Sequence, residues 1–267
     1  MIVISSKDQG CITLTSTIKL NFRGSPGLLL VGRSGMGKTQ LATYISLKFM
    51  SQMHGGLLIV DNKRSDLSTL SKYLNNGEQV VATTVGQTAK LLRNMVDNMN
   101  NRASHFRGNF GQDWLDYNLR PYLILIDEVA ALIAEANAKE KNELMSLLRQ
   151  LILKGRQAGI FVILSAQRLE ATVIDRSLTL QLGNRIIMGN ADSETYRMVF
   201  PGIDAKELPR IPNKAGYGLI FMDGQDSLLP IPFVAPDMSG ISVPKVISRL
   251  EQEFNYANFA NESSYWQ

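Results

Sequence analysis

The stretch Gly32-Arg33-Ser34-Gly35-Met36-Gly37-Lys38-Thr39 fits the pattern G-x-x-x-x-G-K-[ST] at every fixed position. The apolar run Leu28–Val31 precedes it, and a helical pattern over Lys38–Met50 follows it. Glycines let backbone N–H groups wrap around phosphate oxygens without steric conflict, and the first turn of a helix attracts anions. A strand, a glycine-rich turn and a helix in this order therefore predict a phosphate-binding loop.

This loop predicts which residues contact a nucleotide. Lys38 is placed to reach the β- and γ-phosphates of ATP, and the Thr39 hydroxyl is placed to bind Mg²⁺. ATP and Mg²⁺ are therefore the expected ligands. The expected nucleotide-binding residues are Gly32, Arg33, Ser34, Gly35, Met36, Gly37, Lys38, Thr39 and Gln40.

Two acidic residues follow a second apolar run, Tyr122–Ile126. Ligand sites of α/β proteins form at the carboxyl ends of parallel strands, so we expect Asp127 and Glu128 beside the loop. There Asp127 would hold Mg²⁺ through water, and Glu128 would be the base that polarises the water attacking the γ-phosphate. Gln167 follows another apolar run, Ile160–Leu164, and is expected to sense the γ-phosphate or to position that water.

Basic residues form a second group of candidates. Ring-shaped ATPases complete each nucleotide site with an arginine from the neighbouring subunit. The candidates are Arg149, Arg156, Arg168 and Arg185, of which Arg156 and Arg185 are preferred; for each one alone, a solvated surface charge is the alternative. The basic turn Asp61-Asn62-Lys63-Arg64 is interpreted either as a contact for DNA phosphate or a neighbouring subunit, or as a solvated turn.

Apolar runs bounded by turn residues alternate with helical patterns along the chain, which predicts the α/β class with a mostly parallel sheet flanked by helices. Strands are expected at Leu28–Val31, Leu57–Val60, Val80–Val85, Tyr122–Ile126, Ile160–Leu164, Arg185–Met188 and Tyr217–Met222. Further helices are expected at Gln87–His105, Lys139–Gln157 and Val246–Phe254. We divide the chain into a β-rich lead-in (1–27), a main domain (28–225), and a Pro-rich connection with a C-terminal helix and tail (226–267).

Composition narrows the classes of function. The chain has 267 residues, 45% hydrophobic and 19% charged, which is ordinary for one large α/β domain. Its net charge of +4 permits nucleic-acid contact without demonstrating it. The single cysteine, Cys11, excludes an intrachain disulfide and fits a reducing cytoplasm. No run approaches the roughly 20 apolar residues of a membrane span, so we expect a cytoplasmic protein that meets membranes through a partner or a missing anchor.

Four stretches together resemble the FtsK/SpoIIIE branch of the HerA-FtsK ATPases: Gly32–Thr39, Leu57–Leu67, Pro121–Leu132 and Leu147–Arg168. Within this branch, the chain resembles the DNA-coupling motors of conjugative elements and plasmids in Gram-positive bacteria. The resemblance implies a RecA-like core, a homohexameric ring, and ATP hydrolysis between subunits while DNA passes through the channel. Leu169 stands where the family usually has a proline, which favours the mobile-element branch over the chromosome-partitioning translocases.

The resemblance also implies that Lys38, Thr39, Asp127, Glu128 and Gln167 form the nucleotide site. The first interpretation is an ATP-driven DNA translocase for conjugative or plasmid transfer, with a relaxase and secretion-channel proteins as partners. A second keeps the fold but exchanges the cargo, giving a protein-export ATPase that resembles the type VII secretion motors. A third is a nucleotide-gated scaffold that docks a relaxase–DNA complex. The form of the DNA, single- or double-stranded, stays open.

Overall fold

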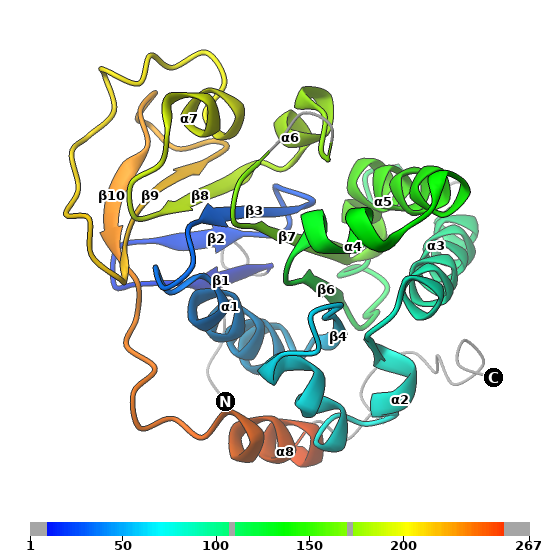
Figure 1. Cartoon of the computed structure of the whole chain (residues 1–267). Coiled ribbons are helices and arrows are strands. Elements are labelled where there is room, and N and C mark those ends of the chain that lie inside the picture. Colours follow the sequence, from blue (N-terminus) through cyan, green and yellow to red (C-terminus); the bar gives the residue numbers. More distant parts are fainter. Residues whose placement is uncertain (1–9, 107–109, 170–172, 254–267) are drawn as a thin grey trace.

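The computed structural model describes residues 10–106, 110–169 and 173–253 (Figure 1). An eight-stranded sheet forms its centre, with the strand order β10-β9-β8-β3-β7-β6-β4-β5. Its strands are β3 (Gly27–Gly32), β4 (Gly56–Val60), β5 (Val81–Ala82), β6 (Tyr122–Ile126), β7 (Ile160–Ala166), β8 (Asn184–Met188), β9 (Tyr217–Met222) and β10 (Ile231–Val234). All neighbouring strands from β8 to β5 pair in parallel. The predicted α/β class with a mostly parallel sheet is confirmed.

Helices cover both faces of the sheet (Figure 1). One face carries α1 (Lys38–Met53), with α8 (Val243–Glu253) packed against it. The other face carries α3 (Val85–His105), α5 (Ala138–Ala158) and α6 (Arg176–Gln181), and α3 packs along α5. The short helices α4 (Val129–Glu135) and α7 (Ser193–Val199) follow β6 and β8, and η1 (Asp66–Lys72) and α2 (Gly77–Val80) connect β4 to β5. None of the helices in the described ranges combines the length and apolar character that crossing a membrane requires.

The connections create a switch point between β3 and β7. From β3 the chain passes through α1 to β4 on one side, whereas from β7 it passes through α6 to β8 on the other side. Parallel strands whose connections leave in opposite directions open a crevice at their carboxyl ends, where ligands of α/β proteins bind. The glycine-rich loop leaves the end of β3, so it lies in this crevice.

A small antiparallel sheet precedes the main one. Its strands are β1 (Cys11–Thr13) and β2 (Lys19–Asn21), and β1 packs against α1. Three aromatic rings join this region to the core: Phe22 after β2, Phe49 of α1 and Phe161 of β7 meet edge to face, with centroids 5.3 to 5.9 Å apart. Such edge-to-face contacts favour one relative placement of the elements that meet.

The Pro-rich stretch after residue 224, expected to be an irregular connection, contains β10. This strand pairs antiparallel with β9, and Pro232 lies opposite Leu219. A proline cannot donate to a sheet ladder, so it is tolerated here because β10 is an edge strand. The sheet therefore continues beyond residue 225. The tail predicted at the end of the chain falls within residues 254–267, which lie outside the described part of the chain.

The strand expected at Val80–Val85 is wrong in most of its length. Val80 ends the short helix α2, and only Val81 and Ala82 pair with β4. The Thr84 side chain accepts a hydrogen bond from the backbone N–H of Gln87, so it caps α3 and starts that helix two residues earlier than expected. The helix therefore begins within the segment where the strand was predicted. Separately, the short helix α4 is not predicted from the sequence.

Two buried arginines join the elements at the amino edge of the parallel strands. Arg102, near the end of α3, donates from Nη1 to the carbonyl of Ala158 at 2.6 Å and from Nη2 to that of Arg120 at 2.8 Å. Arg120 in turn donates to the carbonyls of His54 and Gly55, both at 3.2 Å. The carbonyls at the ends of α1 and α5 lack partners within their own helices, so these cations satisfy them.

We predict that Arg102→Met lowers the free energy of unfolding by at least about 3 kcal/mol, because it removes two hydrogen bonds from a buried cation at roughly 1.5–3 kcal/mol each. Urea denaturation followed by circular dichroism measures the change. Arg93→Met, on the same helix, is the matched control, since the exposed Arg93–Glu143 ion pair contributes less than about 1 kcal/mol. Equal losses in the two variants would contradict the structural role of Arg102.

Candidate nucleotide-binding site

A pocket of about 380 Å³ lies at the carboxyl edge of the parallel strands, where β3, β7 and β6 end. Residues from the glycine-rich loop, from the end of β6 and from the end of β7 meet there, together with two residues that the sequence analysis did not assign to the site. The lining consists of Arg33, Ser34, Gly35, Gly37, Lys38, Thr39, Gln40, Lys63, Asp127, Glu128, Gln167 and Ala215. Most of the expected side chains are therefore brought together in space.

The loop has the backbone conformation that its glycines allow. Gly35 and Gly37 have φ angles of 79° and 94°, in the left-handed region that glycine adopts without steric cost. Gly32 allows a close approach to β8, because a Cβ there would lie 2.6 Å from the carbonyl oxygen of Met188. Among the described residues no side chain caps the start of α1, so its first N–H groups are left for an anion.

Lys38 is the first residue of α1 and is only 8% exposed. Burial lowers the pKa of its ammonium, and the nearby carboxylates of Glu128 and Asp127 oppose that change. A desolvated ammonium between a helix start and two carboxylates gains from an added anion, since its solvation by water has already been lost. The side chain is thus suited to bind a phosphate group.

Thr39 and Asp127 form a pair of oxygen ligands. The Thr39 hydroxyl donates to Asp127 Oδ1 at 3.3 Å. Burial raises the pKa of Asp127, and the neighbouring carboxylate of Asp61 raises it further, against the opposing hydrogen bond from Thr39. The neighbours of Asp127 only partly balance the negative charge of its carboxylate, so the carboxylate favours a nearby cation.

These two residues fit Mg²⁺. Magnesium prefers hard oxygen ligands and is held by one or two protein groups plus phosphate oxygens and water. Within the described residues no cluster of three or more histidine, cysteine or acidic side chains could hold a metal alone. The ion would therefore depend on Thr39, Asp127 and the nucleotide together.

Glu128 lines the pocket and is held there by two contacts. It is 8% exposed, and its Oε1 accepts a hydrogen bond from the backbone N–H of Gln167 at 3.2 Å. Its Oε2 accepts one from Lys63 Nζ, also at 3.2 Å. Gln167 thus contributes its backbone to Glu128 while lining the pocket itself. The sequence singles out the basic turn that carries Lys63 but does not predict its contact with Glu128.

Ala215 belongs to a turn that folds back onto the loop. The backbone N–H of Gly216 donates to the carbonyl of Met36 at 3.2 Å, and the Met36 side chain lies against Gly189. The side chain of Met36, which the sequence assigns to nucleotide binding, is thus partly buried against the core and is not among the residues that line the pocket. Nothing in the local sequence of Ala215 indicates this contact, because it depends on the path of the chain between α7 and β9.

The two preferred arginines lie elsewhere. Among the described residues that line the pocket, neither Arg156 nor Arg185 appears. Arg185 lies near the start of β8 with its side chain 7% exposed; its Nη2 is 3.5 Å from Asp223 Oδ1, and its guanidinium lies 4.6 Å from the centroid of the Phe221 ring. Because its own chain encloses it, Arg185 is poorly placed to reach a neighbouring subunit.

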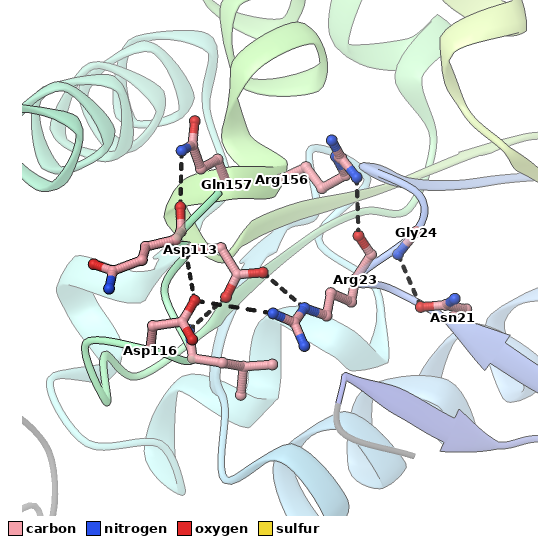
Figure 2. A network of polar contacts seen from close by, with 9 residues as sticks. Asn21, Arg23, Gly24, Asp113, Asp116, Arg156 and Gln157 are labelled. Atoms are coloured by element: carbon pink, nitrogen blue, oxygen red, sulfur yellow. Dashed lines mark hydrogen bonds and ion pairs between the residues drawn. The ribbon is translucent and has the colours of Figure 1, made fainter. Parts of the chain in front are cut away.

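Arg156 is exposed at the end of α5, at the edge of the sheet opposite the pocket. Figure 2 shows it beside the loop after β2, where its Nη1 donates to the carbonyl of Arg23 at 3.3 Å. Arg23 itself pairs with Asp113 at 2.7 Å. Arg149 and Arg168 also have exposed side chains, and Arg168 directly follows Gln167. The exposed arginines, rather than Arg185, are therefore the candidates for an interaction between subunits.

Comparison with known proteins agrees with this geometry. Residues 28–189, more than half of the chain, match the family described as "ATPase family associated with various cellular activities (AAA)". The chain belongs to this AAA family. The glycine-rich loop, Asp127, Glu128 and Gln167 all fall within the matched residues.

The AAA chain is also similar to the FtsK domain-containing protein YdcQ of Bacillus subtilis (strain 168), with 28% identity over 214 residues. The match covers 79% of the chain and 44% of YdcQ, so the chain spans less than half the length of this relative. The FtsK resemblance found in the sequence motifs is thus confirmed.

Two solved structures show the same fold. The pCW3 conjugation coupling protein TcpA, in its monomer form with ATPγS, has a TM-score of 0.74 at 24% identity, and the match covers 92% of this chain and 73% of TcpA. The cytoplasmic domain of the Thermomonospora curvata type VII secretion ATPase EccC has a TM-score of 0.62 at 21% identity, and the match covers 91% of this chain and 31% of the EccC chain. At these identities the likeness establishes the fold.

We predict that Asp127→Asn stabilises the unliganded AAA chain at pH 7–8. Because the folded state raises the pKa of Asp127, its ionised form opposes folding above that pKa, and the amide removes this cost. The gain in stability of Asp127→Asn over the parent should shrink as the pH falls through the raised pKa toward the usual range of an aspartate. Thermal unfolding of both proteins between pH 4 and pH 8 measures this difference.

Asp97→Asn, an exposed position on α3, is the control and should stay within about 0.5 kcal/mol of the parent. Mg²⁺ with ATP should raise the melting temperature of the parent more than that of Asp127→Asn. A destabilised Asp127→Asn variant at neutral pH would contradict the electrostatic account.

Proposed function

We propose that this chain hydrolyses ATP with Mg²⁺ and couples the hydrolysis to the movement of DNA through a ring of identical subunits. The observation that supports it best is the meeting of Lys38, Thr39, Asp127 and Glu128 in one pocket at the start of α1. Each group has one task in phosphoryl transfer, and membership of a family of ATPases agrees with that assignment.

The residues divide the reaction between them. The N–H groups at the start of α1 and the Lys38 ammonium hold the phosphates and offset their charge. Thr39 and Asp127 would hold Mg²⁺, which would supply further positive charge to the phosphates. A Glu128 carboxylate oxygen accepts the proton of the attacking water as the new bond to the γ-phosphorus forms and the bond to the β–γ bridging oxygen breaks.

Gln167 lines the pocket and its backbone N–H contacts Glu128, which supports the proposal that its side-chain amide orients the attacking water or contacts the γ-phosphate. Because its backbone N–H also holds Glu128, a shift of this residue on phosphate release would move the base with it. Gln167 is therefore the proposed sensor of the γ-phosphate.

DNA is the proposed cargo because of what the similar proteins are. One is named as an FtsK domain-containing protein and another as a conjugation coupling protein, and both match most of this chain. The mild positive charge agrees with contact to phosphate backbones. We further propose a homohexamer, a cytoplasmic location, and contact with a relaxase and secretion-channel proteins, through which the chain would meet a membrane.

Protein export is the second candidate. It is favoured by the similarity to the EccC cytoplasmic domain, which covers 91% of this chain at the lower TM-score of 0.62. The nucleotide chemistry would be the same in both cases, so the stimulating cargo is what separates them.

We predict that the purified chain hydrolyses ATP faster with DNA at low salt, where contacts to phosphate are strongest. Lys38→Ala and Glu128→Gln should each reduce the rate by at least about 100-fold, because they remove the phosphate-binding cation and the base. Phosphate release with double-stranded, single-stranded or no DNA measures this. Lys48→Ala, farther along α1, is the control and should retain the parent rate.

The outcomes separate the two cargoes. Stimulation by DNA that both site variants abolish supports the DNA motor and reveals the preferred strand form. Hydrolysis that depends on Lys38 but ignores DNA at low salt would move the assignment to protein export. Hydrolysis that survives both site variants would overturn the proposed nucleotide site.

A further inference from the structure

A second lysine lies in the nucleotide pocket, outside the phosphate-binding motif. Lys63 belongs to the turn after β4, and its Nζ lies 3.2 Å from Glu128 Oε2. The Lys63 side chain is 40% exposed, whereas that of Glu128 is 8% exposed. A solvated cation therefore reaches inward to a buried carboxylate beside the space where a nucleotide would bind.

The turn that carries Lys63 is held in place by Asp61. This buried carboxylate accepts two hydrogen bonds through Oδ2, from the Ser65 hydroxyl and from the backbone N–H of Ser68, both at 2.9 Å. Arg64 has a φ angle of 53°, a left-handed conformation that is uncommon for residues other than glycine, and its N–H donates to the carbonyl of Asp61. These contacts fix the conformation of the turn from which the Lys63 side chain reaches the pocket.

With Lys63 in contact, both carboxylate oxygens of Glu128 have a partner. One carboxylate oxygen faces the N–H of Gln167 and the other faces the Lys63 ammonium. A carboxylate that pairs with an ammonium in this way is poorly placed to take a proton from water in the pocket. The structure thus shows the proposed base in a paired state.

A bound γ-phosphate would change the balance of charge. It would bring about two negative charges close to Glu128, and it offers three acceptor oxygens to a donor. Lys63 has a flexible stem and three donors, and it already lines the pocket. Its ammonium would therefore be attracted more strongly to the phosphate than to the single charge of the carboxylate.

We propose that Lys63 is a γ-phosphate-binding residue that leaves Glu128 when ATP enters the pocket and returns to it when phosphate departs. Glu128 is then free to act as a base only while a γ-phosphate is present, and it is paired in the unliganded and ADP-bound states. This inference rests on the proposed function, because it requires ATP to bind with its γ-phosphate between Lys38 and Glu128.

The test compares binding of ATPγS and ADP, both with Mg²⁺, by isothermal titration calorimetry. Lys63→Met should weaken ATPγS binding about tenfold, the effect of one charge-assisted contact, and change ADP binding less than about twofold. Lys63→Arg keeps a cation and should preserve the preference for ATPγS over ADP. Arg64→Met removes the adjacent exposed charge, which does not line the pocket, and should leave both affinities unchanged.

Separate results would contradict the nucleotide site and the role of Lys63. If the parent binds neither nucleotide, or if Lys38→Ala binds both as well as the parent does, the nucleotide site itself is wrong. If binding depends on Lys38 but Lys63→Met keeps the parent's preference for ATPγS, only the role of Lys63 is overturned. Equal weakening by Lys63→Met and Arg64→Met would also overturn it, since that result indicates a general effect of charge.

Discussion

The parallel register of β3, β7 and β6 is the constraint on which the site depends. Val31 lies opposite Ala166, and Ile126 lies opposite Leu164, so the three strands end at one edge. The residues that follow them, the glycine-rich loop, Gln167 and Asp127, must then meet. A one-residue slip of β6 would turn every side chain of that strand to the other face and move the two acids away from Lys38.

Local signals were enough to predict this part of the molecule. The glycines, Lys38 and Thr39 lie on one continuous segment, and Asp127, Glu128 and Gln167 follow within three residues of short apolar runs bounded by turn residues, a pattern that favours buried strands. Lys63 and Ala215 could not be assigned in the same way. Their place in the pocket depends on how two turns fold back over the strand ends, and the sequence next to each residue does not predict the course of those turns.

The arginines show the limit of such predictions most clearly. Arg185 and Arg156 look equally available in the sequence, yet one is enclosed by Phe221 and Asp223 and the other is exposed. Arg102, which received no role, is among the most buried large side chains. A guanidinium can satisfy several carbonyls or lie over an aromatic ring, so burial of an arginine depends on partners that are distant in sequence.

The two edge strands of the sheet have a consequence for how copies of the chain could associate. β5 contributes only Val81 and Ala82, and β10 is four residues long and contains Pro232, which lacks a donor. Long unpaired edges invite strands from other molecules, and short or proline-containing edges discourage them. Copies of the chain that associate would therefore contact each other through side chains on helices and loops, which can separate again, rather than through a continuous hydrogen-bonded ladder that would lock them together.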